Sequence, residues 1–272
     1  MLAASPDSPG QELLVHLGSL RRAAKLLDHL GSLRRAAKLL DHLGSLRRAA
    51  KLPVSKGPPR TPRRIVTRHD AYMRLASRDF TLALPAWIDD FLESEPDLIA
   101  DRAGRMQFVH RLADRNWREG SGGPFAALVA ESETGRIVSV GVNVVLSTGV
   151  SSGHAEVLAL GTAQKAVGTW DLGAAGLPAH ELVVNWRPCV QCYGATFWSG
   201  VRTVVTAGFG PELEEITTFD EGPVRDDWVE QFERRGIHVV NDIEKDGALA
   251  VYRNYRAAVD AGGINVYNAR QG

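Results

Sequence analysis

The chain has 272 residues, 44% of them hydrophobic and 24% charged, which is an ordinary composition for a globular protein. No apolar run approaches the roughly 20 residues that a membrane-spanning helix needs, and two cysteines are too few for a disulfide framework. The N-terminus lacks the basic segment followed by an apolar one that marks a secretory signal, so we expect a cytoplasmic protein with reduced thiols.

The zero net charge conceals two regions of opposite charge. Residues 1–64 hold 13 Lys/Arg against 4 Asp/Glu, a net charge of +9, whereas residues 65–272 hold 19 against 28, a net charge of −9. Proteins that bind nucleic acids draw affinity from Lys and Arg contacts to phosphates. The acidic region therefore argues against a nucleic-acid substrate, although the basic region could bind acidic surfaces or membranes.

A tandem repeat occupies the N-terminal region. The segment HLGSLRRAAKL begins three times at intervals of 13 residues, from His16 to His42. At 100° per residue each copy is rotated by about 140° from the previous one, so the copies share no helix face. We predict that residues 1–52 form a basic arm, partly helical or disordered, and that the proline-rich residues 53–78 form a linker. The globular domain would then cover residues 79–272.

The globular region alternates between segments typical of helices and of strands. Two helices come first, at Pro85–Glu95 and Pro96–Trp117. Strands are predicted at Phe125–Glu131, Arg136–Asn143, Glu181–Trp186, Val201–Ala207 and Ile237–Val240. The further helices are predicted at His154–Val167, Pro188–Trp198, around Trp228–Phe232 and at Ala248–Val259. Residues 208–223 are predicted to be a loop.

This order of elements predicts the fold class. The short turn at residues 133–135 makes the first two strands antiparallel, and the later strands alternate with helices. We therefore expect an α/β fold with a five-stranded mixed sheet that helices cover on both faces.

Two short segments contain the side chains of a metal site. Glu156 follows His154 by two residues, and Cys189 and Cys192 form a C-x-x-C pair. Zinc favours four nitrogen and sulfur ligands, and a catalytic site keeps one position for water. Three ligands without an obvious fourth therefore favour a catalytic zinc site. Both segments lie at predicted helix starts, where the helix dipole favours the thiolates that a metal requires.

Glu156 is the candidate catalytic residue. Its carboxylate would take a proton from the attacking water and deliver it to a ring nitrogen and a departing amine. Alone, either motif is weaker evidence, because the cysteine pair could equally serve a redox centre or a structural zinc site. The combination of the two motifs favours the site of a zinc deaminase.

The region from about Met106 to Phe209 resembles the cytidine deaminase-like superfamily, within its guanine, cytosine and tRNA-adenosine deaminase branch. The segments that carry the resemblance are Gly123–Val129, Gly141–Asn143, Gly153–Val157 and Pro188–Ala195. The resemblance implies a three-layer α/β/α sandwich, one zinc ion per subunit, a homodimer, and hydrolytic deamination of an amino-substituted heterocycle.

The resemblance also implies residues that bind the substrate. Asn143 would hydrogen-bond the polar edge of the base, Ala155 would line its site, and Phe125 and Trp198 would pack on its ring faces. Each also has a structural interpretation: an asparagine at a strand end commonly forms a turn, and aromatic residues commonly belong to the core.

The later part of the chain adds three candidates and one departure. Asp220 or Glu221 would read the purine edge, and Tyr267 would cover the active site; a solvated acidic loop and a frayed terminus are the alternatives. The superfamily usually has a Ser or Thr and an acid before the Pro-Cys pair, where this chain has Trp186 and Arg187. We expect these two side chains near the mouth of the pocket.

We therefore predict a zinc-dependent hydrolase that deaminates a free purine base or nucleoside, guanine-like by preference, and releases ammonia. Three alternatives remain open at this point. They are a cytosine or cytidine deaminase, a tRNA adenosine deaminase, and a zinc-containing binding module without turnover.

Overall fold

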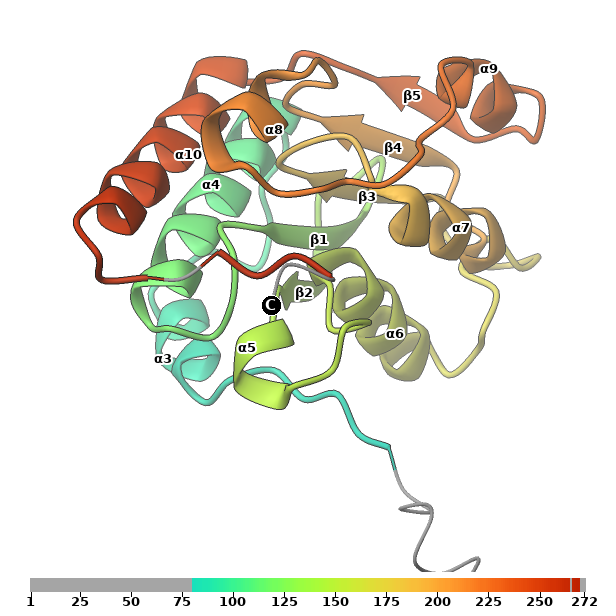
Figure 1. Cartoon of the computed structure of the whole chain (residues 1–272). Coiled ribbons are helices and arrows are strands. Elements are labelled where there is room, and N and C mark those ends of the chain that lie inside the picture. The colour runs from blue at the N-terminus through green and yellow to red at the C-terminus, as the bar shows by residue number, and fades with distance from the viewer. Residues whose placement is uncertain (1–79, 265, 270–272) are drawn as a thin grey trace, which may run out of the picture. The chain divides into compact units, whose positions relative to one another are not determined.

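A computed structural model describes residues 80–264 and 266–269 (Figure 1). The predicted basic arm (residues 1–52) and linker (residues 53–78) lie outside the described residues. Within the described part of the chain, no helix combines the length and the apolar character that crossing a membrane requires.

Five strands form one mixed sheet in the order β2-β1-β3-β4-β5. They are β1 (Ala126–Glu131), β2 (Ile137–Val142), β3 (His180–Val184), β4 (Thr203–Thr206) and β5 (His238–Val240). β1 pairs antiparallel with both β2 and β3, whereas β3, β4 and β5 run parallel. Every residue of the interior strand β1 is buried, as its apolar sequence predicts. The five predicted strands and the antiparallel first hairpin are thus confirmed.

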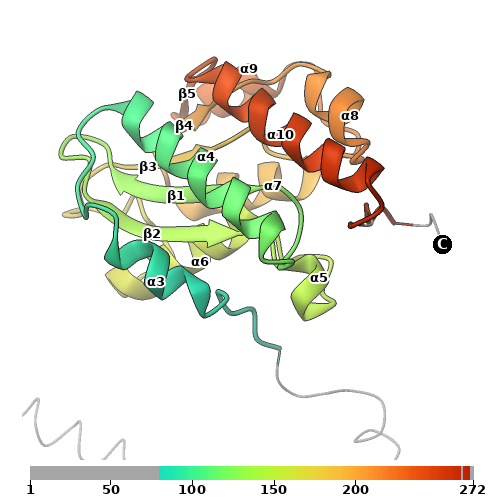
Figure 2. The same ribbon diagram turned by 90° about the vertical axis from the view of Figure 1, so that its left-hand side faces the viewer.

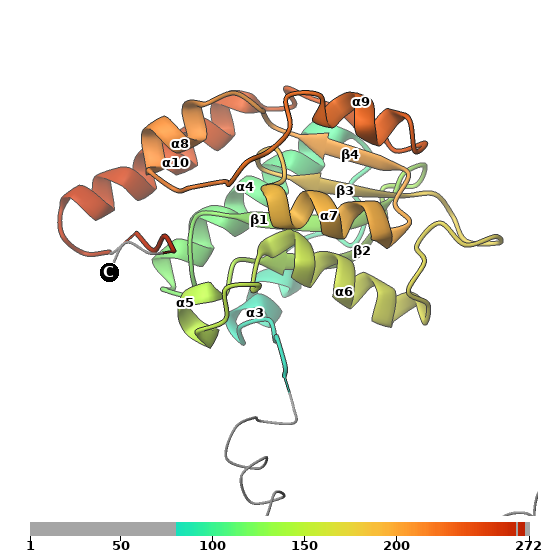
Figure 3. The ribbon, with the colours of Figure 1, turned by 45° about the vertical axis from the view of Figure 1, so that its right-hand side comes forward.

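Helices cover both faces of the sheet. Figure 2 shows the layer with α4 and α10 in front of the strands, and Figure 3 shows the layer with α6 and α7. The first layer contains α3 (Trp87–Glu93), α4 (Arg102–Arg118), α8 (Glu212–Thr217) and α10 (Lys245–Asp260). The second contains α6 (Ala155–Val167), α7 (Val190–Ser199) and α9 (Trp228–Glu233).

The side chains of β1 alternate between the two layers. Leu128 belongs to the apolar cluster of the first layer, whereas Ala127 and Val129 belong to that of α6. This alternation is the period-2 pattern of a strand with two buried faces. The predicted three-layer α/β/α sandwich is confirmed.

Some predicted boundaries are wrong. The second helix, α4, begins at Arg102 rather than Pro96, because the Asp101 carboxylate accepts a hydrogen bond from Gly104 N at 2.8 Å and so caps the helix there. Leu98, in the predicted first turn, instead forms an isolated bridge with Arg136. One short helix, α8, lies in the predicted loop of residues 208–223, and another, α5 (Val145–Thr148), follows β2 where no helix was predicted. Helices of four and six residues are too short to carry a clear periodic signal.

β2 and α6 approach one another closely at Gly141. A Cβ atom at this position would lie 2.0 Å from the carbonyl oxygen of Ala155 and 2.5 Å from the backbone nitrogen of Ala159. Only glycine allows this contact between the strand and the helix backbone. The contact holds the end of β2, which leads to Asn143, against the start of α6, which His154 precedes.

Candidate active site

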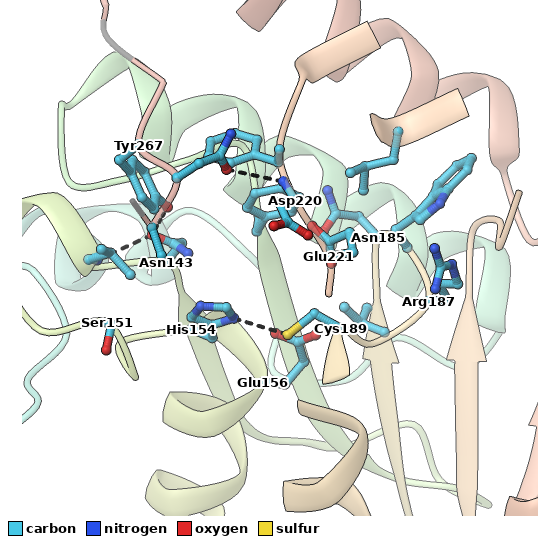
Figure 4. Close-up of a pocket in the computed structure, with 18 residues that line it drawn as sticks. Asn143, Ser151, His154, Glu156, Asn185, Arg187, Cys189, Asp220, Glu221 and Tyr267 are labelled. Carbon is cyan, nitrogen blue, oxygen red and sulfur yellow. Dashed lines mark hydrogen bonds between the residues drawn. The ribbon is translucent and has the colours of Figure 1, made fainter. Parts of the chain in front are cut away.

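A cavity of about 210 Å³ brings together most of the residues singled out in the sequence (Figure 4). Those that line it are Phe125, Asn143, His154, Glu156, Cys189, Asp220, Glu221 and Tyr267. Trp186 and Arg187, which were expected near the mouth of the pocket, line it as well. Residues more than 100 positions apart in the chain therefore share one cavity.

Two helix starts lie on one side of this cavity, and we call their four side chains the floor: His154, Glu156, Cys189 and Cys192. The first three line the cavity, and Cys192 is buried beside His154. His154 and Cys189 are the N-cap residues of α6 and α7, and Glu156 and Cys192 lie in the first turns. The two N-caps have extended backbones and no side-chain capping bond, so their ring and thiol are free to face the cavity. Helix α7 begins at Val190 rather than at the predicted Pro188.

The three metal-ligand side chains fit a zinc ion as they stand. His154 Nδ1 lies 3.4 Å from Cys189 Sγ and 3.6 Å from Cys192 Sγ. Zinc–nitrogen and zinc–sulfur bonds of about 2.0 and 2.3 Å at a tetrahedral angle place the two ligand atoms roughly 3.5 Å apart. All three ligand atoms lie within 4.8 Å of one another, and the group could hold a metal ion.

The charged side chains of the floor include His154 and Cys189, whose pKa values shift in opposite directions. Burial alone would lower the pKa of His154, but the neighbouring Cys189 raises it to about 9. A hydrogen bond from Cys192, with the His154 charge, lowers the pKa of Cys189 to about 4. Cys189 is therefore a thiolate at neutral pH, paired with a cationic ring. A zinc ion would supply the positive charge in place of the ring proton, because metal ligands bind in their deprotonated forms.

Two carboxyl groups face the same space, that of Glu156, which is buried, and that of Glu221, which is partly buried. Burial is the main cause that raises the pKa of Glu156, whose side chain lies beside both cysteines. Burial, followed by the negative charges of Cys189 and Glu156, raises the pKa of Glu221 to about 8. At neutral pH Glu221 therefore holds a proton and can donate a hydrogen bond.

The opposite side of the cavity, which we call the wall, consists of Asn143, the loop of residues 218–221 and the tail of residues 266–269. Asn143 is 3% exposed, and its Oδ1 accepts a hydrogen bond from the Tyr267 hydroxyl at 2.5 Å. The Phe125 ring meets Phe219 edge-on, with centroids 5.1 Å apart. The wall thus joins segments that are distant in the chain.

Trp186 and Arg187 line a further side of the cavity. Trp186 is 2% exposed, its ring packs on Tyr252 with centroids 5.6 Å apart, and its N–H donates to Gly210 O at 3.1 Å. Gly208 lies so close that a Cβ there would be 2.5 Å from the ring. Arg187 contacts Glu214, with Nη2 and Oε1 3.5 Å apart. Trp186 is therefore a rigid side of the cavity, while Arg187 adds positive charge to it.

The sequence-based expectation is wrong for Trp198 and Ala155 as residues of this cavity. Trp198 is 82% exposed. It follows Cys189 by nine residues, which is two and a half turns at about 3.6 residues per turn, so it lies on the opposite side of α7. Ala155 is fully buried with Ala127 in the packing of α6 against the sheet. Neither residue lines the cavity.

Sequence reasoning missed two side chains that shape the cavity. Asn185 Oδ1 accepts from Ala126 N at 3.2 Å and Asn185 Nδ2 donates to Pro124 O at 2.9 Å, so its amide ties β3 to the start of β1. Phe219 contacts both Phe125 and Tyr267. The sequence could have indicated both residues, because each lies next to a segment that was singled out: Asn185 precedes Trp-Arg-Pro-Cys, and Phe219 precedes the acidic pair.

Comparisons with known proteins agree with this geometry. The zinc-binding region of cytidine and deoxycytidylate deaminases matches residues 101–208. The solved structure of guanine deaminase from Nitrosomonas europaea is 40% identical, with a TM-score of 0.63, over 67% of this chain and 98% of that chain. A structure solved in complex with 2,6-diaminopurine is 41% identical, with a TM-score of 0.63, over 70% of this chain and 97% of that one.

A curated relative matches over a shorter region. Guanine deaminase from Bacillus subtilis is 32% identical over 96 residues, which are 35% of this chain and 57% of that protein. The match thus spans a little over half the length of this relative. The solved relatives, in contrast, are covered almost from end to end at 40% identity or more. This chain therefore belongs to the cytidine deaminase-like family of zinc-binding deaminases.

Proposed function

We propose that this chain deaminates guanine, or a closely related amino-substituted purine, to the corresponding oxo compound and ammonia. The observation that carries the proposal is the group of three metal ligands, placed for tetrahedral zinc, with the Glu156 carboxyl beside them in a cavity. The likeness to two guanine deaminases supports the choice of guanine. Guanine and water would give xanthine and ammonia.

His154, Cys189 and Cys192 would hold one zinc ion per chain. Zinc supplies the Lewis acidity that makes water nucleophilic near neutral pH. Glu156 would carry the two protons of the attacking water one after the other, the first to the ring nitrogen and the second to the leaving amine. Its raised pKa suits this task, because a carboxyl that takes and gives protons works best with a pKa nearer the working pH.

The remaining polar groups would orient the base. Glu221, protonated near neutral pH, would face a ring nitrogen or an oxygen of the substrate, and Asn143 would bind a polar atom at the other end. Phe125, Phe219 and Trp186 give the cavity apolar surface for a planar ring. Asp220 is exposed at the rim, where it would meet a polar edge of the base.

We also propose that the protein is a cytoplasmic homodimer. Thiolate ligands require a compartment that keeps Cys189 and Cys192 reduced. In the layer of α6 and α7, Trp170 is 76% exposed and Trp198 is 82% exposed, and large apolar side chains of this kind are commonly buried in an interface. Sedimentation should give twice the chain mass, and Trp198→Ala should weaken the association. A wild-type protein with the mass of one chain at micromolar concentration would contradict the dimer.

A substrate panel tests the proposed reaction. Zinc-loaded protein should release ammonia from guanine faster than from guanosine, cytosine, cytidine or adenosine, and tRNA should not be a substrate. Protein that carries one zinc ion per chain but releases no ammonia from any of these would refute the proposal, and would leave a zinc-containing binding module as the better description.

A further inference from the structure

The tail that follows α10 returns to the cavity and contributes two side chains to its wall. Tyr267, labelled in Figure 4, lines the cavity. Asn268 lines it as well. The Tyr267 ring packs edge-on against Phe219, with centroids 5.1 Å apart, and its hydroxyl reaches Asn143 and Gly123. These contacts join positions separated by 124 and 144 residues in the chain.

The Asn143 amide is fixed by three donors. Its Oδ1 accepts hydrogen bonds from the Tyr267 hydroxyl at 2.5 Å, from Val145 N at 3.2 Å and from Gly123 N at 3.4 Å. The Tyr267 hydroxyl accepts in turn from Gly123 N at 3.2 Å, so its proton is committed to Asn143. A rotated amide would turn its NH₂ group toward the backbone N–H of Val145, and two donors would then face one another.

The other end of this amide is left for a ligand. Within the described part of the chain, Asn143 Nδ2 has no protein partner, and the residue lines the cavity. An amide with its oxygen occupied and its NH₂ group unpaired presents a donor only. A ligand atom at this position must therefore be an acceptor, such as a carbonyl oxygen or an unprotonated ring nitrogen.

Asn268 anchors the tail beside this contact. Its Oδ1 accepts from Asp220 N at 3.1 Å, and its Nδ2 donates to Thr218 O at 2.8 Å. Thr218 has φ +64°, a left-handed conformation that is unfavourable for a threonine. The two hydrogen bonds hold the tail against this loop, which keeps the Tyr267 hydroxyl within reach of Asn143.

We propose that Tyr267 is a positioning residue that orients Asn143 as a hydrogen-bond donor, and that the cavity thereby selects bases with an acceptor at this position. The inference rests on the proposed function. Guanine satisfies the requirement through its carbonyl oxygen and its unprotonated ring nitrogens. A base that presents an N–H group there would leave two donors opposed, which costs affinity.

Tyr267→Phe tests the inference, because it removes the hydroxyl and keeps the ring that packs on Phe219. We expect the KM for guanine to rise about 5- to 10-fold, the loss associated with one hydrogen bond, while kcat changes less than twofold because the floor is untouched. Tyr255→Phe is the matched control. Tyr255 stacks on the same Phe219, and within the described residues its buried hydroxyl has no partner. The KM of Tyr255→Phe for guanine should stay at the wild-type value.

The same substitution made in an Asn143→Ala protein distinguishes a positioning role of Tyr267 from a general structural role. If Tyr267 acts through Asn143, then Tyr267→Phe should change neither KM nor kcat further in an Asn143→Ala protein. Equal effects in both backgrounds would overturn the inference, as would an unchanged KM in Tyr267→Phe alone. If Tyr267→Phe does not fold, Asn268→Ala replaces it, with the same expected rise in KM and the same dependence on Asn143.

The two proposals fail in different ways. Wild-type protein that contains zinc and does not act on guanine overturns the proposed function and this inference together. Active wild-type protein whose KM is insensitive to Tyr267→Phe overturns the inference alone. Zinc content, measured for every variant, should remain one ion per chain.

Discussion

The floor and the wall of the cavity are built in different ways. The floor uses residues two or three positions apart at the starts of α6 and α7, and the helix backbone fixes their spacing. The wall uses the end of β2, the 218–221 loop and the 266–269 tail, joined by hydrogen bonds across as many as 124 residues. Local geometry therefore places the metal ligands and Glu156, while long-range contacts place the side chains proposed to bind the base.

The largest expected effect comes from breaking the floor itself. Cys192→Ser replaces a fully buried ligand sulfur, so the protein should lose most of its zinc and its turnover together, because zinc prefers thiolate and imidazole ligands. Metal analysis and ammonia release measure the two losses. Gln191→Ala, which changes the exposed residue between the cysteines, is the control and should keep both zinc and activity.

Glu156→Ala separates the metal from the proton transfer within the floor. We expect zinc to stay bound and kcat to fall by about 10²- to 10⁴-fold, the range that general acid–base catalysis contributes. Loss of zinc in parallel with turnover would contradict the assigned role, because it would make Glu156 a part of the metal site rather than a proton carrier.

Glu221 connects the wall to the floor, and its charge can be followed by pH. Its pKa is raised from 4.5 to about 8 in the folded chain, so between these values the folded protein holds a proton that the unfolded chain has released. The unfolding free energy of the zinc-free protein should therefore fall as the pH rises from about 4.5 to 8. Denaturant titrations at several pH values should show a smaller decrease for Glu221→Gln.

The matched control for this titration lies one residue away. Asp220 is in the same loop but exposed, and Asp220→Asn should leave the pH dependence of the unfolding free energy as it is in the wild type. Equal slopes for the wild type and Glu221→Gln would contradict the raised pKa of that carboxyl.

The smallest effect is expected from the N-terminal region. If the floor and wall suffice for the reaction, a protein that lacks residues 1–64 should keep kcat/KM for guanine within twofold of the full chain. A larger loss, with zinc content unchanged, would mean that the basic region contributes to the cavity or to its substrate.

The same contrast explains what the sequence could predict. His154, Glu156, Cys189 and Cys192 are found from spacing alone, since neighbouring positions at a helix start stay neighbours in space. The five strands follow from apolar runs of ordinary length. These features are local, so the periodicity of helices and strands translates them directly into structure.

What was missed depends on contacts that the sequence order does not contain. Tyr267 was singled out as a cover of the site, but its hydrogen bond to Asn143 arises only when α10 has packed and the tail has returned. The helix α8 lies in a segment rich in glycine, proline and acids, and is held by the burial of Leu213 and Thr217. Trp198 was predicted to pack on the base because of its position in the motif. Its helical rotation, nine residues after Cys189, places it on the opposite side of α7 instead.

The close approach of β2 to α6 at Gly141 has a consequence for substrate size. Where a strand backbone touches a helix backbone, repacking of side chains cannot change the distance between them. The separation between Asn143 and His154 is therefore set by the main chain. Exchanging side chains in the wall can change which groups of a base are read. The length of ring that fits between the metal ligands and Asn143 would change only if the strand and the helix moved apart.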